Sequence, residues 1–313
     1  HMMNEARLGV GFQAFAYASA AYLYALNYAR ERIQGRDLAA GKDPNAPAVP
    51  IIQHPDVRRM LLEMKAYVDG MRSFVHYVGQ CLEKEALATS EDERAYYKGF
   101  GDLLTPLVKA YCAQRGFDQC VQAVQVYGGY GYITEYPVEQ LVRDCKITSI
   151  YEGTDGIQAM DLLGRKLGMA KGQVFISFLG EIQKTVARAK EIPGLEEITT
   201  EVEKATNRLG EVAMHLGASA MSAQFKVAFA AAFPFLEVMG DVIMAWMLLW
   251  RAVLANQKLD NGAKKKDVDF YEGQLKTAEF FIQTILPATL GKMDGIVKSN
   301  SSAIEISDAA FGG

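Results

Sequence analysis

The chain has 313 residues, of which 50% are apolar and 22% are charged, and its formal net charge is -4. This composition is typical of a soluble globular protein with room for two domains. A nucleic-acid-binding domain would need a basic surface, so the acidic balance argues against that class of protein. The 4 cysteines are widely spaced without a C-x-x-C pair, which predicts reduced, buried thiols and a cytoplasmic location.

The first residues and one apolar stretch need separate treatment. His1-Met2 before Met3 is typical of residues left by an expression vector, so the natural sequence is expected to begin near Met3. The stretch 227–250 is apolar enough to suggest a membrane span. It contains a proline and two acidic residues, and a charged group is costly at bilayer depth. A buried or interface helix, with no membrane span, is the better interpretation.

Helical periodicity dominates the chain. Apolar residues between 57 and 82 recur every three or four positions, which predicts one face of a long helix. Pro55 and Asp56 suit its first turn, where a missing N–H is harmless and a negative charge meets the helix dipole. The segment 35–50, with its glycines and three prolines, is predicted to be a loop, and no strand is predicted. Further helices are predicted over 4–33, 91–127 and 138–145, and from Thr154 to near Gly168.

These elements predict an all-α fold in two parts. The segment 3–170 is predicted to form an antiparallel four-helix bundle. A second helical domain is predicted over 171–298, with helices over 174–190, 200–259 and 267–293 and a bend near Pro234. The tail 299–313 is rich in Ser, Ala and Gly and is expected to be flexible.

Two local patterns could carry chemistry. The run Gly128-Gly129-Tyr130-Gly131 allows the backbone to approach a ligand closely and to hold a phosphate with its N–H groups. The same run could simply end a helix. Glu152 lies beside Ile150 and Tyr151, and a carboxylate desolvated by such neighbours becomes a competent general base. Its alternative role is that of an acid at the start of a helix.

Other charged residues give weaker signals. Arg30, Arg32 and Arg36 near the end of the first helix could satisfy terminal carbonyls or reach a pyrophosphate. His54 and His215 have no Cys, His or acidic partner at ligand spacing. No metal site is therefore predicted.

Taken together, these patterns resemble the signature of the acyl-CoA dehydrogenase family. The order and spacing of 125–132, 135–139, 143–147 and 150–154 match that signature, and 7–11 with 29–32 resemble the family's first C-terminal helix. The insertion 35–50, the run 54–59 and the second helical domain resemble a bacterial subgroup similar to methylthiopropanoyl-CoA dehydrogenase. The family's N-terminal helical domain and middle β-domain have no counterpart in the chain, so the resemblance covers only a C-terminal fragment.

The resemblance implies a reaction and a set of site residues. The reaction is FAD-dependent oxidation of acyl-CoA to trans-2-enoyl-CoA, with Glu152 taking the α-proton and its backbone N–H binding the thioester oxygen. The implied substrate contacts are Arg7, Tyr151 and Gly153. The implied FAD contacts are Arg32, Gln125, Gly128 and Gly129 toward a neighbouring subunit and Thr154 toward its own. An electron-transfer flavoprotein and a homodimer or homotetramer are the implied partners.

Two other functions remain open from the sequence. The chain could be a non-catalytic helical oligomerisation module, because the missing domains supply much of the flavin and acyl sites. It could also be a relative of acyl-CoA oxidases, which pass electrons to oxygen. Whichever of these functions the parent protein has, the isolated chain is expected to be inactive and to hold little FAD.

Overall fold

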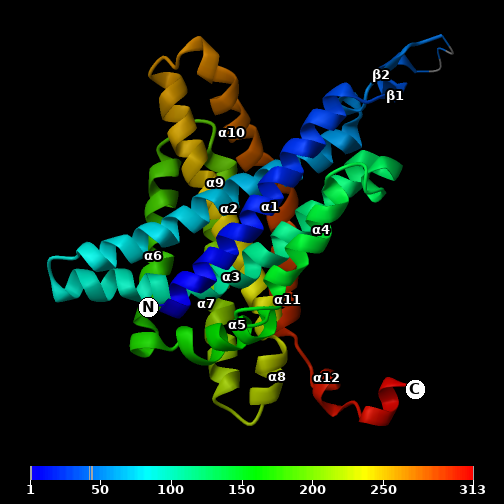
Figure 1. Cartoon of the computed structure of the whole chain (residues 1–313). Coiled ribbons are helices and arrows are strands. Elements are labelled where there is room, and N and C mark those ends of the chain that lie inside the picture. The colour runs from blue at the N-terminus through cyan, green and yellow to red at the C-terminus, as the bar shows by residue number, and fades with distance from the viewer. Residues whose placement is uncertain (1, 42, 44, 313) are drawn as a thin grey trace.

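The computed structural model of the chain describes residues 2–41, 43 and 45–312. Nearly all of this part of the chain is helical, which confirms the predicted all-α class (Figure 1). The first five helices are α1 (Met2–Glu31), α2 (Pro55–Leu87), α3 (Glu91–Tyr127), α4 (Val138–Lys146) and α5 (Asp155–Asp161). The later helices are α6 (Gln173–Lys190), α7 (Glu196–Ala220), α8 (Phe225–Ala230), α9 (Ala232–Asp260), α10 (Val268–Phe280), α11 (Leu286–Val297) and α12 (Ser302–Glu305).

Small residues let α1 and α3 pack in close contact. A Cβ at Gly11 would lie 2.6 Å from the carbonyl oxygen of Val108, and a Cβ at Gly116 would lie 2.7 Å from that of Ala14. The buried face of α1 continues this stripe with fully buried alanines: Ala14, Ala18, Ala21, Ala25 and Ala29. Helices whose backbones touch are held rigidly, so the two ends of α1 are fixed relative to α3.

The predicted limits of α3 are confirmed, and their causes are local. The Ser90 hydroxyl accepts a hydrogen bond from the Glu93 N–H at 3.2 Å and caps the first turn. At the other end Gly128 has φ +62, a left-handed conformation that glycine adopts without strain.

The prediction of a strand-free loop over 35–50 is wrong in part. Strand β1 (Ile33–Arg36) pairs antiparallel with β2 (Ala48–Pro50), and Figure 1 shows this hairpin projecting beyond the bundle. A short 3-10 helix, Leu38–Ala40, lies between the strands. Such short strands leave no alternating pattern in the sequence, and Pro50 is tolerated because it lies at a strand end. Positions 42 and 44 of the predicted loop lie outside the described residues.

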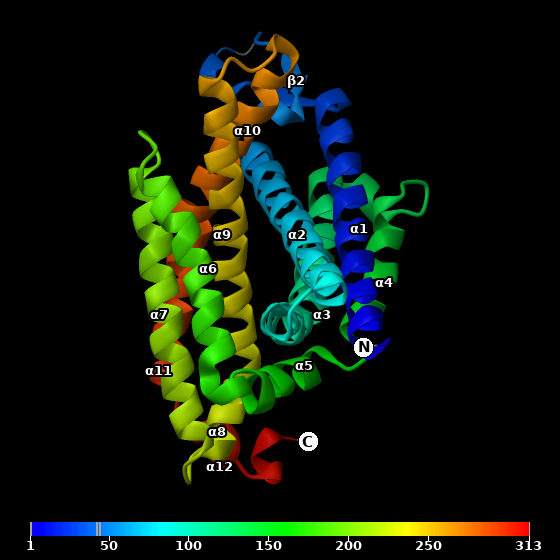
Figure 2. The same ribbon diagram turned by 90° about the vertical axis from the view of Figure 1, so that its left-hand side faces the viewer.

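The second domain surrounds α9. Figure 2 shows α6, α7, α9 and α11 side by side, with α9 facing α2 of the bundle. By length and composition α9 could cross a membrane, but its most apolar window is 83% buried inside the chain. This helix therefore serves as a core helix of the fold, as the buried-helix interpretation predicted.

The predicted single helix over 200–259 with a bend near Pro234 is wrong. The chain leaves helical geometry after α7, forms the short helix α8, and starts again at α9. The Ser222 hydroxyl donates to the Ser219 carbonyl and accepts from the Gln224 N–H, so a serine turn replaces the helix there. Pro234 lies in the first turn of α9, where its missing N–H costs nothing.

A buried polar cluster joins the two domains. The Tyr111 hydroxyl on α3 donates to Asp241 Oδ1 on α9 at 2.6 Å, and the Thr289 hydroxyl on α11 donates to Asp241 Oδ2 at 2.9 Å. Arg115 adds a contact to the same carboxylate at 3.4 Å. The apolar core around this cluster runs without interruption through both domains. In the tail, α12 contacts α8, while the flexibility of 299–313 stays a prediction.

Candidate active site

The loop between α4 and α5 holds Glu152 in an unusual backbone conformation. Glu152 has φ +56 and Gly153 has φ +89, so two successive residues are left-handed. The Gln158 amide donates to the Glu152 carbonyl at 3.3 Å from beneath the loop. The Thr154 hydroxyl accepts from the Ile157 N–H at 3.3 Å and starts α5, as predicted. A non-glycine residue in this conformation is strained, and such strain is found at functional sites.

Within this chain the Glu152 side chain is exposed, so its predicted desolvation by Ile150 and Tyr151 is wrong. Ile150 is 52% exposed, and Tyr151 is 37% exposed with its hydroxyl donating to Gln13 on α1, so neither side chain buries the carboxylate. They belong to an exposed apolar patch around the loop, consisting of Ile147, Ile150, Tyr151, Ile157 and Met160. Exposed apolar side chains near a carboxylate make this loop a candidate contact for another molecule or domain.

A buried ion pair lies beneath the loop, and sequence reasoning missed it. Lys109 Nζ lies 3.2 Å from Asp155 Oδ1, and the Lys109 side chain is fully buried. Burial lowers the pKa of Lys109 and raises that of Asp155, while each charge opposes the shift of the other. The only sequence signal was a lysine inside the apolar run Leu103–Ala113. Arg7 is half-buried in the same region, and its Nε has no hydrogen-bond partner.

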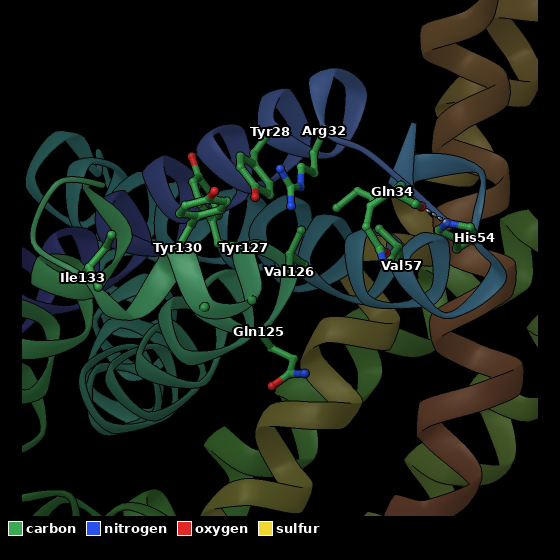
Figure 3. A pocket seen from close by; sticks show the side chains of 13 residues that line it. Tyr28, Arg32, Gln34, His54, Val57, Gln125, Val126, Tyr127, Tyr130 and Ile133 are labelled. Carbon is green, nitrogen blue, oxygen red and sulfur yellow. Dashed lines mark hydrogen bonds between the residues drawn. The ribbon is translucent and has the colours of Figure 1, made fainter. Parts of the chain in front are cut away.

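The predicted FAD contacts at the far end of α1 come together in one cleft of about 620 Å³. Arg32, Gln125, Gly128 and Gly129 all line it, and the other lining residues include Tyr28, His54 and Tyr130. Figure 3 shows Arg32 on one side of the cleft, with Gln125 on another side and its amide pointing away from Arg32.

The walls of this cleft combine aromatic rings with bare backbone. The Arg32 guanidinium lies 5.1 Å from the centre of the Tyr130 ring, and Tyr28 stacks on Tyr127 at 4.0 Å. No atom lies within 4 Å of the Cβ position at either Gly128 or Gly129. The glycine run therefore both ends α3 and leaves open backbone that a ligand can approach. The contribution of His54, whose Nε2 lies 2.7 Å from the Gln34 carbonyl, was not predicted.

The structure does not bring the two groups of predicted residues together. Arg7 and Arg32 are 25 residues apart along α1 and its end, which corresponds to about 38 Å at 1.5 Å per residue. Arg7, Tyr151, Glu152, Gly153 and Thr154 lie near the first end, and the cleft lies at the second end. One chain thus carries a carboxylate site and a separate cleft suited to an anion.

The structure is thus a helical bundle with a strained carboxylate loop at one end and a glycine-lined cleft at the other. The class of protein follows from the protein families that this chain matches. Two family models match the chain: "Acyl-CoA dehydrogenase, C-terminal domain" over residues 1–167 and "Acetyl-CoA dehydrogenase C-terminal like" over residues 178–307. The chain belongs to the acyl-CoA dehydrogenase family.

Curated relatives match almost the whole chain. The broad-specificity linear acyl-CoA dehydrogenase FadE5 of Mycobacterium tuberculosis is 35% identical over 99% of the chain and 52% of its own length. The 3-methylmercaptopropionyl-CoA dehydrogenase of Ruegeria pomeroyi is 36% identical over 98% of the chain and 51% of its own length. The predicted subgroup is confirmed, and the chain spans about half the length of these relatives.

More distant relatives share the fold or the first domain. The Bacillus anthracis acyl-CoA dehydrogenase solved with FAD has a TM-score of 0.67 at 19% identity, over 99% of this chain and 50% of that one. Subunit CarC of the caffeyl-CoA reductase-Etf complex of Acetobacterium woodii is 32% identical over 53% of the chain and 37% of its own length.

Proposed function

We propose that the chain forms the C-terminal half of an FAD-dependent acyl-CoA dehydrogenase that oxidises acyl-CoA to trans-2-enoyl-CoA. The observation that carries this proposal is the Glu152 loop: a strained backbone presents an exposed carboxylate inside an exposed apolar patch. An acyl thioester lying on the patch would cover the carboxylate and supply the desolvation that this chain alone lacks.

In the proposed reaction two C–H bonds of the acyl chain break. The α C–H bond gives a proton to a base, and the β C–H bond gives a hydride to an acceptor. The Glu152 carboxylate takes the α-proton, and the electron pair left on the α-carbon forms the new double bond as the β-hydride leaves. The Glu152 N–H donates to the thioester oxygen, where enolate charge develops. Arg7, with an unpaired Nε, would bind an anionic part of CoA. FAD, when bound, accepts the hydride from the β-carbon.

The cleft residues fit the phosphate part of FAD. Arg32 supplies a guanidinium, and the open backbone at Gly129 allows a pyrophosphate to come close. The Bacillus anthracis relative binds FAD, which supports this assignment by similarity of fold. Thr154 and Gln125 are proposed as the remaining contacts of this chain to FAD.

The distance between the residues near Glu152 and the residues of the glycine-lined cleft supports an active site that is shared between two subunits. Because about 38 Å of helix separates Arg7 from Arg32, we propose that the cleft holds the FAD of a second subunit in a homodimer or homotetramer. An electron-transfer flavoprotein is the proposed electron acceptor, since the Acetobacterium woodii relative assembles with one. Light scattering that shows a clean monomer at high concentration would count against the assembly.

The test of the base uses the full-length enzyme, meaning this chain preceded by the domains that the resemblance implies. The enzyme is mixed anaerobically with acyl-CoA, and bleaching of the flavin band is followed. Glu152→Gln keeps the shape and the N–H but cannot accept a proton, so we expect a loss of roughly 10²–10⁴-fold in reduction rate. Acyl-CoA binding should stay near normal, and a near-normal reduction rate would refute the assignment.

A second candidate function applies to the 313 residues by themselves. The exposed patch around Glu152 favours a helical module that binds other protein surface, since without covering domains it presents five apolar side chains. The isolated chain should then form oligomers but hold little or no flavin. Stoichiometric FAD in the purified chain would argue for a complete site instead.

A further inference from the structure

The Lys109–Asp155 pair is a costly feature to keep in a core. Lys109 lies in the middle of α3 with a fully buried side chain, and Asp155 is 12% exposed at the first residue of α5. Burying two charges costs about as much as their attraction returns, so apolar residues of similar size often stabilise a fold as well or better. Stability alone therefore does not explain this pair.

The position of the pair suggests what it holds. Asp155 directly follows the cap residue Thr154, so an anchor at Asp155 fixes the end of the left-handed loop. One turn later, Gln158 donates to the Glu152 carbonyl at 3.3 Å. A Cβ at Gly153 would lie 2.6 Å from Gln158 Nε2, so the side chain and the loop backbone fit closely. The start of α5 thus supports the loop from below at two points.

The charges around Lys109 come from three elements. Asp155 on α5 and Glu152 on the loop are negative, and Arg7 on α1 is positive. The side-chain amide oxygen of Gln158 (Oε1) and Arg7 Nε are buried without a partner, so the polar groups here are not arranged for maximum stability. A buried polar group without a partner calls for an explanation other than stability.

We propose that Lys109 and Asp155 are positioning residues that hold the Glu152 loop in its left-handed conformation. The buried ammonium anchors Asp155, Asp155 fixes the first turn of α5, and Gln158 in that turn holds the Glu152 carbonyl. The proposal rests on the proposed function, because it concerns the orientation of the proposed base. It assigns no substrate contact to Lys109.

The main test replaces the pair by apolar residues in the full-length enzyme. Lys109→Met with Asp155→Leu removes both charges and should keep the thermal midpoint near that of the wild type. The rate of flavin reduction by acyl-CoA should fall roughly 10²-fold, since small displacements of a reacting group cost that much. Binding of acyl-CoA should change little. A purely structural pair would instead give a normal rate in this double variant.

A matched control uses a second lysine–carboxylate pair of the same region. Lys166 Nζ lies 3.8 Å from Asp102 Oδ1 on α3, close to Arg7, and Asp102 also accepts from Asn4 and Lys98. Within the described residues neither Lys166 nor Asp102 makes a hydrogen bond or ion pair to the Glu152 loop. Lys166→Met with Asp102→Leu should leave the reduction rate within about twofold of normal. An equal loss of rate in both double variants would overturn the proposal.

Hydrogen exchange in the 313-residue chain separates this proposal from the assignment of the base. Removing the Lys109–Asp155 pair should speed amide exchange at Ile157 and Gln158, whose N–H groups donate to the Thr154 hydroxyl and carbonyl, and removing the Lys166–Asp102 pair should not. Unchanged exchange in the first variant would refute the positioning role. Normal flavin reduction by Glu152→Gln would refute the base itself and leave the exchange result standing.

Discussion

Replacing Gly240 by alanine tests how closely α9 of the second domain packs against α3 of the first domain. A Cβ at this position would overlap the ring of Tyr111, lying 2.5 Å from Cγ and closer to two other ring carbons. Carbon atoms in contact sit ~3.5–4.0 Å apart, so the ring or α9 must move by about 1.5–2 Å to relieve the nearest contact. Tyr111 is fully buried and its hydroxyl is tied to Asp241, so the ring cannot simply swing away.

The expected loss of stability has two sources. Overpacking a dense core costs about 1–3 kcal/mol. Weakening the bond from Tyr111 to a buried carboxylate adds about 1.5–3 kcal/mol. Gly240→Ala should therefore lower the free energy of unfolding by roughly 3–5 kcal/mol, measured by urea denaturation of the 313-residue chain.

The control is a glycine of the same domain with free space. No atom lies within 4 Å of the Cβ position at Gly180 on α6, so Gly180→Ala should stabilise the chain by about 0.5–1 kcal/mol. If Gly240→Ala is no less stable than the wild type, α3 and α9 are not held together as described.

Three further predictions follow from burial and hydrogen bonding. All 4 cysteines are buried, with at most 2% of any of them exposed, so a thiol reagent at pH 8 should label none of them before denaturation. Although burial opposes the shift, hydrogen bonds from Lys184 and Tyr96 lower the pKa of Glu181 below its ordinary 4.5. Tyr96→Phe should therefore destabilise the chain more at pH 7 than at pH 3, in paired urea titrations. Gly131→Ala should cost about 1–3 kcal/mol by overpacking against Val124, because its Cβ would lie 2.7 Å from the Val124 carbonyl oxygen.

Local signals in the sequence were enough for the helices that have clear ends. The limits of α3 were predictable because Ser90 and Gly128 lie where a cap and a left-handed stop are needed. The break after α7 was not, because it depends on a serine turn that looks compatible with a continuing helix. The hairpin at 33–50 was missed because its two strands are too short to show alternation.

Some features of the candidate site were likewise predictable from the sequence, and others were not. Four residues of the glycine-lined cleft, Arg32, Gln125, Gly128 and Gly129, were predicted from the resemblance to the family, and the fold brings them together. The Lys109–Asp155 pair joins residues 46 positions apart, and the only local signal was a lysine inside an apolar run. The environment of Glu152 was predicted wrongly, since proximity in sequence to Ile150 and Tyr151 does not decide which way those side chains point.

The distribution of buried and exposed surface separates folding from function in this chain. The core is complete across both domains, with side chains such as Tyr111, Phe74 and Trp246 fully buried. The apolar patch around Glu152 and the cleft at the far end of α1 are open. We therefore expect the 313 residues to unfold cooperatively by themselves, while the proposed chemistry needs surfaces from outside the chain. Since the cleft and the carboxylate lie about 38 Å apart along one helix, the proposed assembly would cover them with different surfaces.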